Sequence, residues 1–172
     1  MIKNDKQLAY SKEWAEKFAE ANRKLRTNVE KRLKDPDGWQ LSQDSNNALR
    51  QKLIDEIVEY ETLVTHPPTN PLVLEISDMN DLPNLLIKAR IAFKLTQQEL
   101  AVLSDRTPEQ IKAFEEKNYH NASFLDFLTI NKVLGIQIIN GKFVAQLDDF
   151  YKQELMTVRQ EANLDSNMKA AS

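Results

Sequence analysis

The chain has 172 residues, a formal net charge of −3 and no cysteine, so disulfide bonds and thiolate metal sites are excluded. Its 41% hydrophobic and 28% charged residues are typical of a globular protein with one compact domain, or a small domain plus an extension. The two histidines, His66 and His120, have no carboxylate cluster around them in the sequence. We therefore expect no metal site and no cofactor.

Membrane proteins and enzymes are disfavoured by what the sequence lacks. No apolar run approaches the ~20 residues that span a bilayer, and the N-terminal stretch has no apolar signal-peptide core. We expect a cytoplasmic protein without membrane contact. The sequence has no Gly-rich phosphate loop, no nucleophile elbow, and no histidine flanked by carboxylates and a nucleophile. We therefore do not expect an enzyme and assign no catalytic residue.

Positive and negative charges are balanced along the chain. Residues 1–64 hold 12 Lys/Arg and 12 Asp/Glu, and residues 79–137 hold 7 of each. The first balance is typical of a mixed, solvated helical surface. The second argues against strong non-specific DNA affinity, because that affinity comes from Lys and Arg displacing counterions from phosphates.

Residues 1–64 predict an antiparallel helical hairpin for interaction or dimerisation. Helices over about 5–34 and 42–64 are separated by Asp35-Pro36-Asp37-Gly38, whose proline and glycine break the helical pattern. The apolar stripes are Trp14, Phe18, Ala21, Leu25 and Val29 on the first helix, and Leu49, Leu53, Ile57 and Tyr60 on the second. An apolar flank remains uncovered, and we predict that it meets a second copy, another protein or the chain's own C-terminal domain.

Two segments outside the helices predict β-structure. Residues 65–79 form a proline-rich linker in which Leu72 to Ile76 predicts a short strand. Residues 136–162 predict a β-hairpin and a C-terminal helix, because Asn140-Gly141 between β-branched residues indicates a type I′ turn. A small sheet of these strands could pair across a dimer. The helix, over about 146–162, is a further core or interaction face, and residues 163–172 predict a disordered tail.

Residues 80–135 predict four or five short helices. Thr96 and Thr107 each precede a Glu or Gln by three residues, which is the capping-box pattern of a helix start. The stretch KARIAFKLTQQELAVLSDRTPEQIKAFEE, followed by NASFLDFLTINKVLGI, resembles the XRE family, the Cro and phage-repressor class of helix-turn-helix domains. The matching positions are Arg90, Leu95 to Ala101, Ile111, Glu115 and Leu134-Gly135.

The resemblance and the local patterns together define the expected fold. It is mainly α, with the helical hairpin, a repressor-like four- or five-helix domain, a small β-hairpin and a C-terminal helix. The helical N-terminal extension also looks like a bacterial subgroup of helix-turn-helix regulators. Some XRE proteins are antitoxins that bind a toxin and their own operator. The resemblance therefore implies binding to double-stranded operator DNA and a homodimer, with a toxin as a further candidate partner.

The family's roles are carried over to matching positions. Arg90 and Glu115 match an ion pair that joins the first and third helices of the domain and is structural. Gln97 matches a residue whose amide bonds a backbone phosphate. The resemblance places Thr107, Glu109 and Lys112 against base edges, and His120 and Asn121 near phosphates. Arg106 and Lys117 are further DNA-binding candidates because of their positive charge.

Departures from the family pattern leave two functional interpretations open. The turn reads Ser104-Asp105-Arg106 where the family usually has Leu-Gly-Val, and Pro108 and Glu109 stand on the expected reading face. The basic residues near a duplex would be Lys94, Arg106, Lys112 and Lys117, with Lys88 if it is suitably oriented. The chain is either a DNA-binding transcriptional regulator, of which an autoregulating antitoxin is one form, or a protein-interaction module on a repressor-like scaffold with weakened or lost DNA binding.

Overall fold

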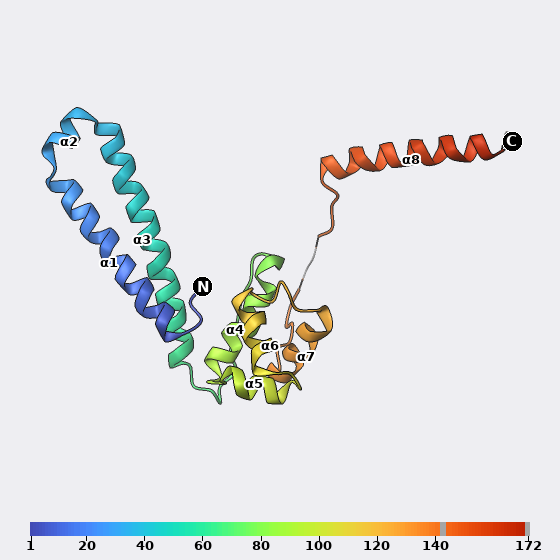
Figure 1. The fold of residues 1–172 in the computed structure, drawn as a ribbon, viewed down its shortest axis with the longest axis horizontal. Helices are drawn as coiled ribbons and strands as arrows, with labels where there is room; N and C mark the ends of the chain where they lie inside the picture. Colours follow the sequence, from blue (N-terminus) through green and yellow to red (C-terminus); the bar gives the residue numbers. More distant parts are fainter. Residues whose placement is uncertain (142–143, 171–172) are drawn as a thin grey trace. The chain divides into compact units, whose positions relative to one another are not determined.

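A computed structural model describes residues 1–141 and 144–170 of the chain (Figure 1). It divides into two compact units, Met1–Ile136 and Gln137–Ser172. Within the described ranges, the regular elements are α-helices and one short 3-10 helix, and no strand is formed. None of the described helices combines the length and the apolarity that crossing a bilayer requires.

The first unit begins with a helical hairpin, in which α1 (Asp5–Thr27) and α3 (Pro36–Thr65) lie side by side and α2 (Val29–Lys34) forms the tip (Figure 1). The helical pattern breaks at Asn28, whose side chain accepts a hydrogen bond from the Lys31 amide and caps α2. Asp35 caps α3 in the same way, and Pro36 occupies its first turn, where the missing N–H is not needed. The residues predicted as a turn therefore start the second helix.

A polar cluster occupies part of the hairpin's interior. The Asn22 amide donates to Asn47 Oδ1 at 2.7 Å and to the Gln43 carbonyl at 3.2 Å, and Asn46 donates to Asn22 Oδ1 at 2.9 Å. The buried residues of α1 are Ser11, Ala15 and Asn22, whereas Trp14 and Val29 of the predicted stripe are exposed. The buried residues of α1 are therefore small or amide side chains, and they lie beside the predicted stripe of larger apolar residues instead of within it.

The opposite end of the hairpin belongs to the core of the first unit. Tyr60 and Leu63 of α3 are buried together with Ile2, which precedes α1, in one cluster with residues of α4 (Leu82–Ala92). Lys88 of α4 forms an ion pair with Glu59 of α3. The hairpin is therefore tied to the following helices, while other apolar side chains along it remain exposed: Tyr10, Leu41, Leu49 and Val58.

The rest of this unit is built from η1 (Met79–Asp81), α4, α5 (Gln97–Leu103), α6 (Pro108–Glu116) and α7 (Phe124–Leu134). Its centre is a group of fully buried apolar side chains contributed by all four α-helices: Leu86, Ile87, Leu100, Ile111 and Ile130. Gly135, in the left-handed conformation at φ 65°, ends α7.

The predicted small β-sheet is wrong. Leu72 to Ile76 is not a strand: Leu72 and Leu74 pack against the core and Val73 faces solvent, so the segment covers the core without a backbone partner. Ile138 and Ile139 are exposed and unpaired, and Asn140-Gly141 does not join two strands within the described residues. The remainder of the predicted hairpin includes residues 142–143, which lie outside the described residues.

The second unit consists mainly of α8 (Asp149–Ala170), which continues beyond the helix end predicted near residue 162. Positions 163–170 of the predicted tail are helical, and 171–172 lie outside the described residues. Among its apolar residues, Phe150, Tyr151 and Val158 are exposed, and Leu155 is half-buried.

Candidate nucleic-acid interface

Helices α5 and α6 form a closely packed pair whose starts are determined by local sequence. Thr96 and Thr107 cap them with complete capping boxes, in which Glu99 and Gln110 return a hydrogen bond to the cap backbone. At Glu99, the hydrogen bond from the Thr96 backbone N–H lowers the pKa of the carboxyl, aided by the Thr96 hydroxyl. The position at which each helix starts is therefore set by hydrogen bonds within its first turn.

The connection between α5 and α6 tolerates residues that depart from the family pattern. Asp105 adopts the left-handed conformation at φ 54°, which aspartate reaches more readily than most residues. The Ser104 hydroxyl is buried and donates to the Leu100 carbonyl at 2.7 Å, so this polar side chain is satisfied by its own helix. The Arg106 amide donates to the Ala101 carbonyl at 2.9 Å and completes the turn.

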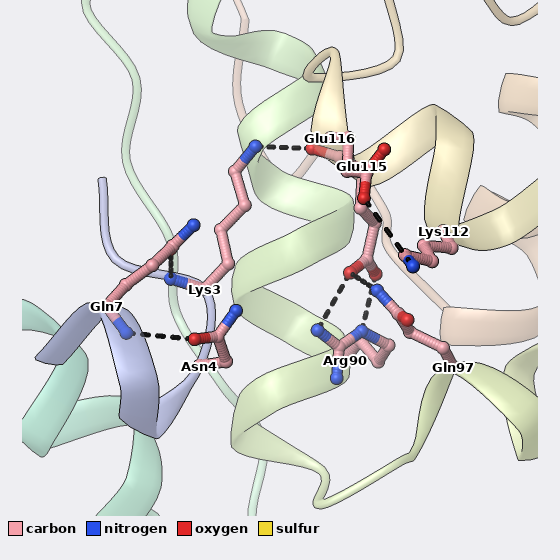
Figure 2. Close-up of a pocket in the computed structure, with 8 residues that line it drawn as sticks. All are labelled: Lys3, Asn4, Gln7, Arg90, Gln97, Lys112, Glu115 and Glu116. Atoms are coloured by element: carbon pink, nitrogen blue, oxygen red, sulfur yellow. Dashed lines mark hydrogen bonds and ion pairs between the residues drawn. The ribbon is translucent and has the colours of Figure 1, made fainter.

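A buried ion pair connects α4 to α6 (Figure 2). Arg90 Nε lies 2.5 Å from Glu115 Oε1, and its NH2 group donates to Glu115 Oε2 at 2.9 Å. The Gln97 amide of α5 donates to the same Oε2 at 2.8 Å, and Arg90 also donates to the Leu95 carbonyl. Because the two charges are almost excluded from water, this bidentate arrangement holds the three helices in one geometry.

Beside this ion pair lies a polar pocket of about 350 Å³ (Figure 2). Lys3, Asn4 and Gln7 line it together with residues of α4 to α6, and Lys3 Nζ donates to the Glu115 carbonyl. Burial lowers the pKa of Lys3, although the Glu115 and Glu116 carboxylates oppose that shift. Sequence reasoning missed these N-terminal residues, because no local pattern signals contact between groups 112 positions apart.

Three of the basic residues predicted to approach a duplex are engaged within the protein. Arg106 Nε donates to Asp126 of α7 at 2.7 Å, and Arg106 is half-buried. The Ser123 hydroxyl, together with Arg106, lowers the pKa of the Asp126 carboxyl. Lys88 pairs with Glu59, and Lys94 Nζ donates to carbonyls at the end of α3. These cations stabilise packing between helices and have little freedom to follow a phosphate backbone.

The exposed side of α6 and the loop after it carry the remaining predicted contact residues. Thr107, the N-cap of α6, is exposed, and so are Glu109 and Lys112 within the helix, where Lys112 Nζ lies 3.9 Å from Glu116. Beyond the helix, Lys117, His120 and Asn121 are also exposed. Gln97, by contrast, is half-buried against Glu115, which leaves part of its amide for another partner.

Comparisons do not assign the chain to a family: no protein-family model, curated protein or solved structure matches it. Among the described residues, no group of three acidic or histidine side chains gathers as a metal ion would need. The exposed side chains of this surface carry hydroxyl, amide, ammonium and carboxylate groups, which can form hydrogen bonds and ion pairs.

Proposed function

We propose that the chain binds double-stranded DNA through the exposed side of α6, as a transcriptional regulator resembling the XRE family. The main support is the Arg90–Glu115–Gln97 cluster, which ties α4, α5 and α6 together and leaves α6 free on its outer side. Thr107 and Lys112 on that side offer a hydroxyl and an ammonium group to a groove and its phosphates. An autoregulating antitoxin is one form of such a regulator.

Binding through this surface is weak for a single chain. Lys112 and Lys117 are its available lysines, and Glu109 repels phosphates at the start of α6. We therefore propose a homodimer that presents two copies of α6, about 34 Å apart, to successive turns of one DNA groove. The exposed apolar residues along the hairpin, or the apolar side of α8, provide the dimer contact.

A second candidate function is docking of a protein partner, such as a toxin, on the helical scaffold. It is favoured by exposed apolar residues on two neighbouring helices: Val102 and Leu103 of α5, and Phe124, Leu125 and Leu128 of α7. Phe124 also stacks on Phe127, which leaves a flat aromatic surface. In this case α6 is only part of the scaffold, and DNA binding is weak or absent.

The first function predicts salt-dependent DNA binding. The protein is titrated into fluorescently labelled DNA from the region upstream of its own gene, starting at about 50 mM salt with micromolar protein. With two available lysines per chain, the logarithm of the association constant should fall against that of salt with a slope of about −2 per bound chain.

An unrelated duplex of equal length serves as the control and should bind more weakly than the upstream DNA. If no salt-dependent binding to either duplex is seen under these conditions, the regulator function is wrong and the docking function is favoured.

A further inference from the structure

The hairpin contains a second pocket, of about 310 Å³, between α1 and α3. Three guanidinium groups line it, those of Arg23 and Arg26 on α1 and Arg50 on α3. Glu16 is its single carboxylate, and it already pairs with Arg23 at 2.8 Å. The pocket therefore carries an excess of two positive charges that its own residues do not neutralise.

Arg50 is the most unusual of these residues. It is half-buried, its Nε atom is shielded from solvent, and that atom has no hydrogen-bond partner. Within the described residues, Arg50 forms no ion pair and no side-chain hydrogen bond. A buried donor without an acceptor is costly, and native proteins nearly always satisfy such groups. The pocket thus lacks an acceptor at this position.

Other donors in the pocket are also free. Arg26 uses Nε to donate to Gln43 Oε1 at 3.2 Å, and no partner is found for its two terminal nitrogens within the described residues. Asn47 uses its oxygen to accept from Asn22, so its NH2 group remains a donor. The free donors are therefore contributed by both helices, and the second carboxylate oxygen of Glu16 is the one acceptor among the lining side chains that has no partner within the described residues.

We propose that this arginine pocket binds a phosphate group. The donors come from both α1 and α3, and guanidinium groups can each form two parallel hydrogen bonds with phosphate oxygens. The charge excess matches a phosphate dianion, and guanidinium groups are the side chains best suited to phosphate in a partly buried site. The site is formed by α1 and α3 alone and does not depend on DNA binding by α6.

The test follows the Nε–Hε signal of Arg50 by NMR in the full-length protein, assigned by its loss in Arg50→Lys. Inorganic phosphate should shift this signal to saturation, whereas sodium chloride at equal ionic strength should not. A parallel titration with a short DNA duplex identifies the source: a response to phosphate alone indicates a small phosphate compound, and a response to both indicates the DNA backbone.

Calorimetry compares the phosphate affinity of two matched variants. In Arg50→Gln, phosphate affinity should fall by about tenfold, the loss expected for one charge-assisted hydrogen-bonded pair. Lys52→Gln removes an exposed charge on the same helix outside the pocket and should stay within about twofold of the parent. If neither phosphate nor duplex moves the Arg50 signal, or chloride moves it equally, the proposed site is wrong.

Discussion

Replacing Glu115 by Gln is expected to lower the free energy of unfolding by about 3–5 kcal/mol, the range for breaking a buried ion pair. Glu115 has a side-chain exposure of 2% and accepts from Arg90 on α4 and from Gln97 on α5. Glutamine has nearly the same shape, so no cavity forms. Its NH2 group would oppose these donors, and the Arg90 charge would stay buried without a counter-ion.

The matched control for this change is Glu116→Gln. Glu116 is the next residue of α6, with a side-chain exposure of 64% and a long 3.9 Å contact to Lys112. Its replacement should change stability by less than about 0.5 kcal/mol. Urea unfolding followed by circular dichroism measures both. A Glu115→Gln protein as stable as Glu116→Gln would show that the pair does not hold the helices together.

Replacing Ile130 by Ala is expected to cost about 2–5 kcal/mol, because Ile130 of α7 is completely buried and its loss leaves a cavity in the core. Thermal unfolding and denaturant titration both report this loss. The surrounding buried residues come from different helices, so local collapse cannot fill the space fully.

Leu128→Ala is the control on the same helix. Leu128 is 44% exposed, so its replacement removes fewer buried contacts than that of Ile130 and should lower the free energy of unfolding by less than about 1 kcal/mol. Equal losses for the two variants would mean that α7 faces the core with a different side from the one that the structure shows.

The ends of the short helices could be predicted from the sequence, because their determinants are local. The capping boxes at Thr96 and Thr107 are confirmed, since each depends on a residue three positions away. The mainly helical character of the chain followed from periodicity in the same way. The ion pair between Arg90 and Glu115 was suggested only by the family resemblance, because 25 positions separate its partners.

The sequence predicted less well which apolar side chains are buried, because neighbouring elements decide which of them are covered. Trp14 and Val29 of the apolar stripe predicted on the first helix are exposed. On α7, Phe124, Leu125 and Leu128 are exposed, whereas Ile130 and Leu134 are buried. The helix therefore has more apolar surface than its neighbours cover, and periodicity alone does not show which part remains open.

The prediction of a β-hairpin is wrong for a related reason. Asn140-Gly141 favours a tight turn, but a strand also needs a partner and a covered face. Ile138 and Ile139 have neither among the residues that the structure describes. The polar pocket beside Arg90 was not predicted, because Lys3 and Glu115, which both line it, are 112 positions apart in the sequence. No local pattern reveals such a contact.

The most direct test of the proposed DNA contact compares three single-charge variants on one labelled upstream duplex at low salt. Lys112→Gln removes a cation from α6 and Glu109→Gln removes an anion from it, while Lys132→Gln alters an exposed lysine of α7. We predict affinity about threefold or more weaker for Lys112→Gln, tighter by a similar factor for Glu109→Gln, and unchanged for Lys132→Gln. Equal affinities for all three variants and the parent would contradict DNA binding through α6.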